Sequence, residues 1–569
     1  MPTKTVNINR PDARNLNNRP LSLVPKPQHR AGLGSARTSP HGLRVAAIDI
    51  GTNSLHMVIV EVTDQLSFRV LGSEKELTQL GSAALVHHKL TRRAMAHTLE
   101  VLGRYQRIAR GLDCDVIRAY ATSAVRESVN GGDFVEAARN QLGLRIQVIT
   151  PEEEARLIYL AVRHAVDLSP GPVLIVDIGG GSAEFIVGNN DKALLLESRK
   201  LGASRLTQQF VHSDPISRGD SKDLAKHIRK QTKDIFNDIR DLKPTHVIGT
   251  SGTMENLVRM CLFQHGEESA RHRLLTDMSR DDFESLFKRL HRSSVDERRD
   301  MPGLDPGRAD QILAGAMVVK HVFDELDCDR IEVCDRALRE GMIIHYMQTH
   351  WPKVRLSVQV RDPRRRSILD LGRRCNFNEK HAHQVASLAL SLFDQLRDEH
   401  ELGPRERELL EFAALAHDVG WHIGHNAHHK HSYYLIKNGD LEGFSPNEID
   451  IIANVARYHR KSPPKKSHDG FVTLDTASQR AVWVLGGILR IADGLDRSHF
   501  NNVLKARALV RKRTVSLTIL TKSDPELDEW GARRKADMLE QALRIKLKIS
   551  ARQLTRKEAR AFLVAKPSH

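Results

Sequence analysis

Residues 45–54 read VAAIDIGTNS, and residues 173–182 repeat the pattern as VLIVDIGGGS. In each stretch an apolar run ends in an aspartate, Asp49 or Asp177, and small residues with a hydroxyl follow before a second apolar run begins. The pattern predicts a β-hairpin whose turn lets backbone N–H groups approach phosphate oxygens, because glycine tolerates a close backbone approach. The aspartate could hold a metal ion or a water molecule beside the phosphate. Two copies predict two facing halves with the phosphates of a substrate between them.

The segments after each hairpin alternate between helical and strand patterns. Residues 91–111 carry apolar residues at helical spacing, and residues 116–121 are typical of a strand. In the second half, a strand pattern runs into a third small-residue turn at residues 249–253, before a helix whose N-terminus would favour anions. This alternation predicts an α/β fold, and we expect two lobes from an internal duplication, at residues 44–170 and 171–347.

The sequence changes character near residue 348. Leucine and alanine recur at helical spacing to about residue 504, which predicts a separate all-helical domain at 348–504. Residues 505–569 combine alternating apolar residues with a further helical pattern, which predicts a small basic α+β domain. Residues 1–43 are rich in Pro, Asn, Arg and Ser and lack an apolar period, so we expect a disordered basic tail.

The composition favours a polyanionic partner and a reducing compartment. The 569 residues carry a net charge of +16, which indicates a polyanion unless the excess is only solvated basic surface. Aromatic residues make up 5%, which argues against base stacking and hence against a specific nucleic-acid partner. Five scattered cysteines without CxxC spacing argue against a disulfide framework. Since no apolar run approaches the roughly 18–20 residues of a membrane span and no apolar signal core is present, we expect a cytoplasmic protein.

Six segments occur in the order found in one enzyme family, at residues 49–57, 121–126, 152–157, 177–184, 249–253 and 338–341. Together they resemble the exopolyphosphatase / guanosine pentaphosphate phosphatase family, densely over residues 44–345. The resemblance implies the ribonuclease H-like fold of actin, heat-shock chaperone ATPases and sugar kinases, in which two α/β lobes surround a cleft. It also implies a homodimer.

The resemblance further implies which residues act in the cleft. Taken alone, Glu154 is typical of a carboxylate that stabilises a helix start, but the resemblance makes it the base that activates the attacking water. Arg126, whose alternative is a surface salt bridge, matches the arginine that meets the terminal phosphate. Asp177 and Glu184 resemble the ligands of metal and water in this family, and Asp49 is a further candidate for holding Mg²⁺. The residues expected to bind phosphate are Gly51, Thr52, Asn53, Ser54, Gly179, Gly180, Gly181, Ser182, Gly249, Ser251, Gly252 and Thr253.

Histidines and carboxylates spread over the helical domain suit a divalent-metal site. Their order resembles the HD-type phosphohydrolase family. The ligands that this resemblance implies are His381, His417, Asp418 and Asp493, with His431 and His459 as candidates for a second metal ion. His383 fits less well as the first ligand, and the histidines at 422, 425 and 428 are typical of a solvated loop. The metal could be Mn, Fe, Mg or Zn. In the alternative, the domain only binds or threads a polymer, as in the many relatives that have lost these ligands.

We therefore expect a magnesium-dependent exopolyphosphatase that removes terminal phosphate from inorganic polyphosphate, with Glu154 as the base. A close alternative is hydrolysis of guanosine pentaphosphate to the tetraphosphate at the same site. A third is a phosphate- or nucleotide-sensing regulatory protein whose chemistry lies in the HD site. Basic runs in the helical half, such as residues 364–366, either line a channel for a long polyanion or form solvated surface.

Overall fold

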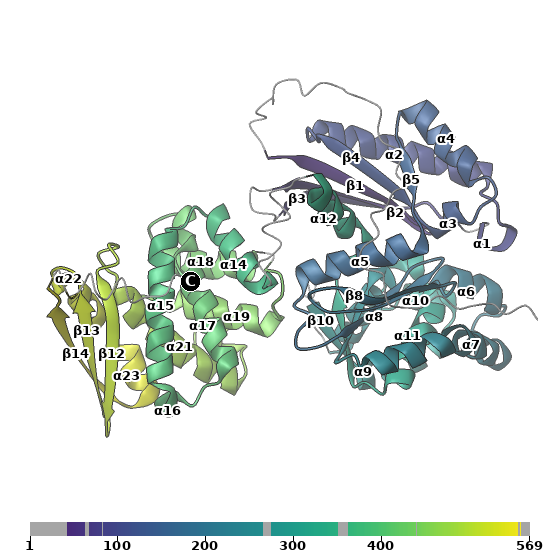
Figure 1. Cartoon of the computed structure of the whole chain (residues 1–569). Coiled ribbons are helices and arrows are strands. Elements are labelled where there is room, and N and C mark those ends of the chain that lie inside the picture. Colours follow the sequence, from purple (N-terminus) through teal and green to yellow (C-terminus); the bar gives the residue numbers. More distant parts are fainter. Residues whose placement is uncertain are drawn as a thin grey trace, which may run out of the picture. The chain divides into compact units, whose positions relative to one another are not determined.

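The computed structural model describes residues 42–62, 68–81, 84–265, 275–350, 362–439, 441–555 and 558 (Figure 1). The tail expected at residues 1–43 therefore lies almost entirely outside the described residues. In the described ranges, no helix combines the length and the apolar character needed to cross a membrane.

Two sheets in the first half of the chain repeat one topology. The first has the order β3-β2-β1-β4-β5, formed by β1 (Arg44–Ile50), β2 (Ser54–Val62), β3 (Phe68–Leu77), β4 (Val116–Ala121) and β5 (Ile146–Val148). The second has the order β10-β11-β9-β6-β7-β8, formed by β6 (Val173–Ile178), β7 (Ala183–Gly188), β8 (Ala193–Arg199), β9 (Val247–Thr250), β10 (Leu275–Ser279) and β11 (Arg330–Cys334). In both sheets an antiparallel hairpin comes first and a parallel strand then joins its first member. The shared topology agrees with the internal duplication that the repeated hairpin pattern predicts.

Helices separate and cover the two sheets. The helices of this half are α1 (Ala84–His87), α2 (Arg92–Gly111), α3 (Ser123–Arg126), α4 (Gly131–Leu142), α5 (Pro151–Ala165), α6 (Ala203–Phe210), α7 (Arg218–Leu242), α8 (Ser251–Gln264), α9 (Arg280–Arg292), α10 (Val295–Arg299), α11 (Ile312–Leu326) and α12 (Leu338–His350). α2 and α4 pack on one face of the first sheet. α5 and α12 share one core with the inner faces of both sheets, and α7, α8, α9 and α11 cover the other face of the second sheet.

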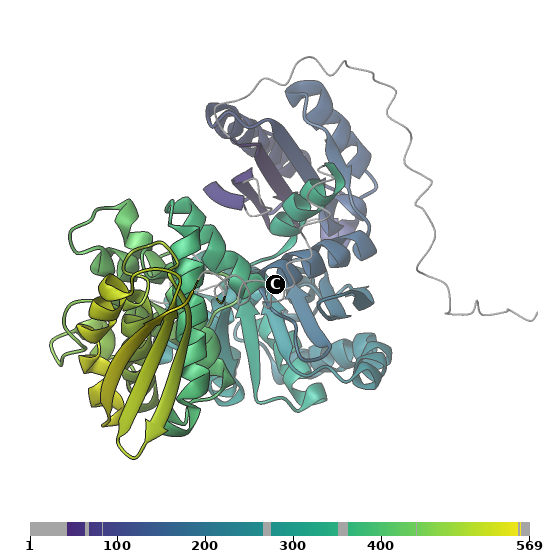
Figure 2. The ribbon, with the colours of Figure 1, turned by 60° about the vertical axis from the view of Figure 1, so that its left-hand side comes forward.

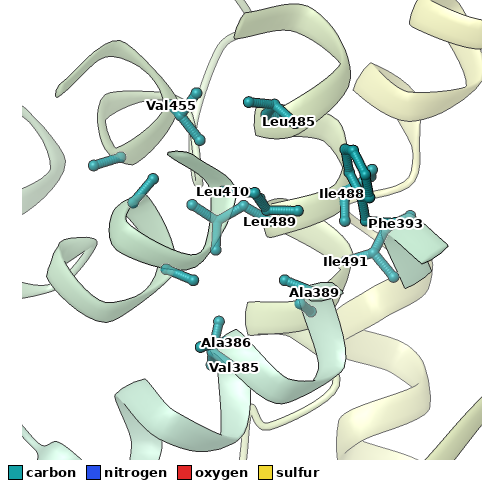
Figure 3. Close-up of a cluster of buried hydrophobic side chains, with 14 of the residues drawn as sticks. Val385, Ala386, Ala389, Phe393, Leu410, Val455, Leu485, Ile488, Leu489 and Ile491 are labelled. Atoms are coloured by element: carbon teal, nitrogen blue, oxygen red, sulfur yellow. The ribbon is translucent and has the colours of Figure 1, made fainter. Parts of the chain in front are cut away.

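The helical domain packs around one large core. Its elements are α14 (Pro363–Arg374), α15 (Glu379–Gln395), α16 (Arg397–His400), α17 (Pro404–Ala416), the short 3₁₀ helix η2 (Val419–His422), α18 (His428–Lys437), α19 (Pro446–Arg457), α20 (Asp469–Val472) and α21 (Thr476–Gly494). Local signals start these helices, as at α19, where Ser445 and Glu448 form a capping box and Pro446 takes the first position. In Figure 3, Leu410 of α17 and Leu489 of α21 lie at the centre of this core.

The C-terminal strands belong to the same core as the helices. They are β12 (Val503–Arg511), β13 (Thr514–Thr521) and β14 (Lys546–Gln553), and α22 (Glu526–Arg533) and α23 (Asp537–Leu543) connect the last two, which pair in parallel. One continuous set of buried apolar residues extends from Ile368 to Ile549, and Figures 1 and 2 show the yellow strands beside the green helices. The segment expected as a separate α+β domain at 505–569 therefore has no core of its own among the described residues.

Candidate active site and metal cluster

The two predicted phosphate turns have the same backbone geometry. The Gly51 N–H donates to the Ser54 carbonyl at 3.1 Å, and the Gly179 N–H donates to the Ser182 carbonyl at 3.0 Å. Each turn joins the two strands of a hairpin whose first strand carries an aspartate, Asp49 or Asp177, one residue before its end. The repeated sequence therefore produces a repeated turn.

The two turns lie against each other, so that small residues are required. The Thr52 and Ser123 hydroxyls are hydrogen-bonded at 2.9 Å. A Cβ atom on Gly181 would lie 2.3 Å from Ser123 Oγ and 2.8 Å from Thr52 Oγ1. No side chain fits at such a contact without movement, which explains glycine at this position.

Strand periodicity directs the acids of both hairpins toward one region. In β1, Val45 and Ala47 belong to the core between the sheets, and Asp49 continues this alternate face. In β6, Val173 and Ile175 belong to the same core, and Asp177 continues their face. Asp177 lies opposite Glu184 in the β6–β7 ladder, so their side chains share that face.

The third turn supports the second one through its hydroxyls. Ser251 has a φ of +85°, in the left-handed region, and its hydroxyl donates to the Ile178 carbonyl at 2.8 Å. The Thr253 hydroxyl donates to the same carbonyl at 2.8 Å. Ser251 and Gly252 line the cavity described below, whereas Gly249 and Thr253 do not.

Glu154 reaches this region from the N-terminus of α5. The Thr150 hydroxyl caps the helix by accepting the Glu153 N–H at 3.1 Å, and Pro151 takes the first helical position. Arg126 Nη1 donates to Glu154 Oε2 at 3.0 Å and to the Ile149 carbonyl at 2.8 Å. The guanidinium therefore fixes the carboxylate from one side.

The four acids of the cleft are buried together, and this changes their ionisation. Burial, together with neighbouring carboxylates, raises the pKa of Asp49 to about 7 and that of Asp177 to about 8, and Arg339 opposes both shifts. Burial also raises the pKa of Glu154, which Arg126 opposes, and it raises the pKa of Glu184 well above its ordinary value. The main cause is burial, which disfavours the charged form of each carboxyl, and repulsion between the carboxylates adds to it; a cation in the cavity would favour the ionised forms.

One cavity of about 120 Å³ joins these groups. The predicted residues that line it are Asp49, Gly51, Thr52, Asn53, Ser54, Glu154, Asp177, Gly179, Gly180, Gly181, Ser182, Glu184, Ser251 and Gly252. Sequence reasoning missed further lining residues, namely His56, Thr122, Ser123, Glu255, Arg308, Gln311 and Arg339. Arg339 and Ser123 lie in segments that carried the family resemblance, so that signal could have found them. Arg126 is absent from the lining because it lies behind Glu154.

A second cluster lies in the helical domain and centres on Asp418. Asp418 Oδ2 lies 3.9 Å from His381 Nε2 and 3.7 Å from His417 Nε2. Asp418 Oδ1 lies 3.3 Å from His428 Nε2 and 3.5 Å from His459 Nε2. Each carboxylate oxygen thus faces a different pair of imidazoles, and the two groups meet the distance requirement for metal ligands.

Asp493 adds a carboxylate to the first of these pairs. Its Oδ1 lies 3.6 Å from His381 Nε2 and 3.9 Å from His417 Nε2. We use the name helical-domain cluster for the six residues His381, His417, Asp418, His428, His459 and Asp493.

The hydrogen bonds of the histidines orient their Nε2 atoms toward Asp418. His417 Nδ1 lies 2.7 Å from the Ala414 carbonyl, and His459 Nδ1 lies 2.7 Å from the Ala456 carbonyl. His381 Nδ1 lies 2.8 Å from Asp496 Oδ2. Since these oxygens only accept, Nδ1 donates its proton to them, and Nε2 is the nitrogen that faces Asp418 and could bind a cation.

Buried atoms without partners point to the same conclusion. Among the described residues, His381 Nε2, His417 Nε2 and Asp418 Oδ1 are buried and have no hydrogen-bond partner. Burial opposes protonation of His381, yet the acids around it raise its pKa to about 9, so this position favours positive charge. The donors are therefore suited to a divalent metal ion.

The structure corrects two expectations for this region. His428, expected in a solvated loop, belongs to the cluster, whereas His431, expected as a ligand, is not part of it. His383 lies outside the cluster too, and its Nε2 is 3.7 Å from Glu379.

The arginines at 364–366 do not form a free basic surface. They lie in α14, and each is ion-paired with a glutamate: Arg364 with Glu448 and Glu408, Arg365 with Glu411, and Arg366 with Glu442. This pairing removes much of the charge that a polyanion channel would use here.

Two family models match the chain in succession. The model of the Ppx/GppA phosphatase family matches residues 58–350, and the model of domain III of this phosphatase family matches residues 363–544. Among solved structures, an exopolyphosphatase from Cytophaga hutchinsonii is 29% identical, with a TM-score of 0.52 over 54% of this chain and 98% of that chain. A Ppx/GppA family member from Aquifex aeolicus is 26% identical, with a TM-score of 0.47 over 54% of this chain and 99% of that chain.

The matches agree with the architecture. The first model covers more than half of the 569 residues and corresponds to the two duplicated lobes. The second extends from α14 to the end of α23, so it treats the helices and part of the C-terminal segment as one unit, as the shared core does. The chain belongs to the Ppx/GppA phosphatase family and is a hydrolase of phosphoanhydride bonds.

Proposed function

We propose that this enzyme is an exopolyphosphatase, which releases terminal phosphate from inorganic polyphosphate in the cleft. The observation that carries the proposal is Glu154, a buried carboxylate that faces one cavity together with three small-residue turns. A protein that only senses phosphate has no need of a base at this position.

The proposed mechanism needs an oriented water, a base and positive charge around the transferred phosphoryl group. Arg126 holds Glu154 Oε2, which orients the carboxylate and leaves Oε1 to accept a proton from the attacking water. The raised pKa of Glu154 makes it a stronger base than an exposed glutamate. The positive charge of Arg126 acts through Glu154, because Arg126 itself does not line the cavity. The N–H groups of the turns orient the phosphates.

Asp49, Asp177 and Glu184 are the proposed ligands of a magnesium ion in the cleft. Two observations support the fit: Asp49 Oδ1 is buried without a hydrogen-bond partner among the described residues, and burial raises the pKa of all three carboxyls. When bound, the ion would supply positive charge to the phosphate oxygens.

Polyphosphate is favoured over guanosine pentaphosphate by the lining of the cavity. Among the described lining residues there is no Phe, Tyr or Trp on which a purine could stack. The net charge of +16 and the similarity to the exopolyphosphatase of C. hutchinsonii point the same way. Hydrolysis of guanosine pentaphosphate remains the alternative for the same site.

The test measures phosphate release from long-chain polyphosphate and from guanosine pentaphosphate, with magnesium, for wild type, Glu154→Gln and Glu153→Gln. We expect Glu154→Gln to lower kcat by about 10²- to 10⁴-fold. Glu153 pairs with Arg156 on the same helix and lies outside the cavity lining, so Glu153→Gln is the matched control and should stay near wild type. An active Glu154→Gln enzyme would refute the assignment of the base. A higher kcat/KM for guanosine pentaphosphate than for polyphosphate would favour the alternative substrate.

We also propose that the helical-domain cluster binds divalent metal, with Asp418 between two ligand groups. The partnerless Nε2 atoms support this proposal. Metal analysis of the purified protein should show that Asp418→Asn loses metal, whereas His431→Asn keeps it, because His431 lies outside the cluster. Equal metal content in wild type and Asp418→Asn would contradict the proposal, whatever the phosphatase activity of the cleft.

A further inference from the structure

The C-terminal segment contributes a cation to the helical-domain cluster. Lys535 lies between α22 and α23, and its ammonium group is ion-paired and hydrogen-bonded with Asp493 Oδ2. The other oxygen, Asp493 Oδ1, is the one that faces His381 and His417. The Lys535 side chain is 18% exposed, so the ammonium group lies in a mostly buried position at the edge of the cluster.

Close packing on α21 fixes the position of Lys535. A Cβ atom on Gly494 would lie 2.7 Å from Ala532 Cα, and one on Gly487 would lie 2.8 Å from Leu539 Cα. These glycines let α22 and α23 lie directly on the helix that carries Asp493. Both close contacts are made to backbone atoms and not to flexible side chains, so the turn that carries Lys535 has little room to move.

A buried arginine connects this turn with the other side of the cluster. Arg490, which is 4% exposed, donates to Asp537 Oδ1 at 3.1 Å in the C-terminal segment. It also donates to the Lys461 carbonyl at 2.8 Å, in the loop that follows His459. One side chain therefore ties together the two segments that carry Lys535 and Arg460.

Arg460 places a second cation on the opposite side of the cluster. Its Nη1 lies 3.0 Å from His428 Nδ1 and 3.1 Å from His428 Nε2, so the guanidinium lies against this imidazole. The half-buried arginine directly follows His459 in the sequence. The cluster thus has a fixed cation beside each of its two ligand groups.

Cations beside a metal site need an electrostatic reason, because they repel the metal ions. The acids within reach are Asp418, Asp493 and Asp496. If the cluster held two divalent ions, the positive charge of the metals, Lys535 and Arg460 would exceed that of these three carboxylates. An anion with several oxygen atoms would balance this excess of positive charge, and a phosphate group fits this requirement.

We propose that Lys535 and Arg460 bind the oxygens of a phosphate group at the helical-domain cluster, which makes the C-terminal segment part of a second phosphate site. The inference rests on the metal binding proposed above. An ammonium group has three N–H donors, and Asp493 is the acceptor found for it among the described residues, so donors remain for phosphate oxygens.

Trp421 offers a signal that is specific to this site. It lies three residues after Asp418, it is 48% exposed, and its ring stacks on His428 with a centroid distance of 5.0 Å and an interplanar angle of 25°. The part of the tryptophan fluorescence that Trp421→Phe removes therefore reports on the cluster.

The experiment titrates inorganic phosphate into the full-length, metal-loaded protein and follows the Trp421 signal. We expect Lys535→Met to keep its metal content and to bind phosphate about tenfold to hundredfold more weakly, since a hydrogen bond to a charged group is lost. Arg460→Met should weaken binding in the same direction, and Lys535→Arg should restore part of it. Lys548→Met, which changes an exposed lysine of β14, is the matched control and should bind like wild type.

Two results would overturn the inference. Phosphate affinity of Lys535→Met equal to wild type would show that the ammonium group does not bind the anion. Loss of metal from Lys535→Met would show that Lys535 only positions Asp493. Failure of the metal proposal would be recognised from the metal analysis. In that case wild type and Asp418→Asn would have the same metal content. The effect of Lys535→Met on phosphate binding could still be measured from the Trp421 signal.

Discussion

Replacing Arg126 by Met should move the acid limb of the pH–rate profile of the cleft to higher pH. Arg126 Nη1 lies 3.0 Å from Glu154 Oε2, and the two side chains are only 17% and 9% exposed. Opposite unit charges about 4 Å apart interact by about 4 kcal/mol at an effective dielectric constant of about 20. Neighbouring charges of opposite sign lower a carboxyl pKa by about 1–3 units. Burial already raises the pKa of Glu154 and Arg126 opposes this, so removing Arg126 raises it further.

The sign follows from the role of the base. Glu154 must be ionised to accept a proton, and a higher pKa means that activity is lost at a higher pH as the solution is acidified. We therefore expect the acid limb of kcat/KM for polyphosphate to shift up by about 1–3 pH units in Arg126→Met. The matched control is Arg156→Met, which removes an arginine of α5 that is paired with Glu153 at 2.9 Å and is 36% exposed. An unchanged limb in Arg126→Met, or an equal shift in Arg156→Met, would refute the reasoning.

Two further predictions concern packing and stability. Gly181→Ala should lower kcat/KM at least tenfold with little change in Tm, because its Cβ would lie 2.3 Å from Ser123 Oγ and would displace the facing turns. Gly132→Ala is the control. A Cβ there would have no atom within 4 Å, so kcat/KM should stay at the wild-type value. Comparable activity of the two variants would contradict this. Burial lowers the pKa of His400, whose Nδ1 accepts the Leu402 N–H at 2.9 Å. In the unfolded chain this histidine has its ordinary pKa of about 6.5. As the pH falls below that value, the unfolded chain therefore takes up the proton before the folded protein does. The free energy of unfolding should therefore fall by up to about 1.4 kcal/mol per pH unit below that value from this group, and urea titrations should show a shallower fall for His400→Gln. Equal slopes for the two proteins would remove His400 as the cause.

The cleft was predictable because short-range patterns fix most of it. The apolar runs that end in Asp49 and Asp177 set the strand period, and this period determines that both acids continue the inner face. The cap at Thr150 and Pro151 likewise determines where α5 begins and hence where Glu154 lies. Residues such as Arg308 and Gln311 could not be found this way, because tertiary packing alone brings them to the cavity.

The metal cluster shows where prediction from the sequence alone fails. His431 was predicted as a ligand because its order in the chain resembles that of the extra histidines in the HD-type family. In the structure, however, the inward face of α18 is formed by His428, Ser432 and Ile436, four residues apart. Reading that helical period back from Ile436 would have identified His428. The loop before α18 obscured the start of the helix, since Ala427 takes a left-handed conformation with a φ of +59°.

The core shared by the helices and the last strands has a consequence for biosynthesis. The residues of the helical-domain cluster have all been synthesised once Asp493 is added, but Ile545 and Ile549 still have to join the core around them. A nascent chain that ends between these points exposes apolar helix faces with no sheet to cover them, which is the state most open to chaperones and proteases. The duplicated lobes, whose residues end before α14, can complete their own cores earlier. The enzyme should therefore mature in two steps, with the phosphatase cleft first and the metal cluster only when the last strand has paired.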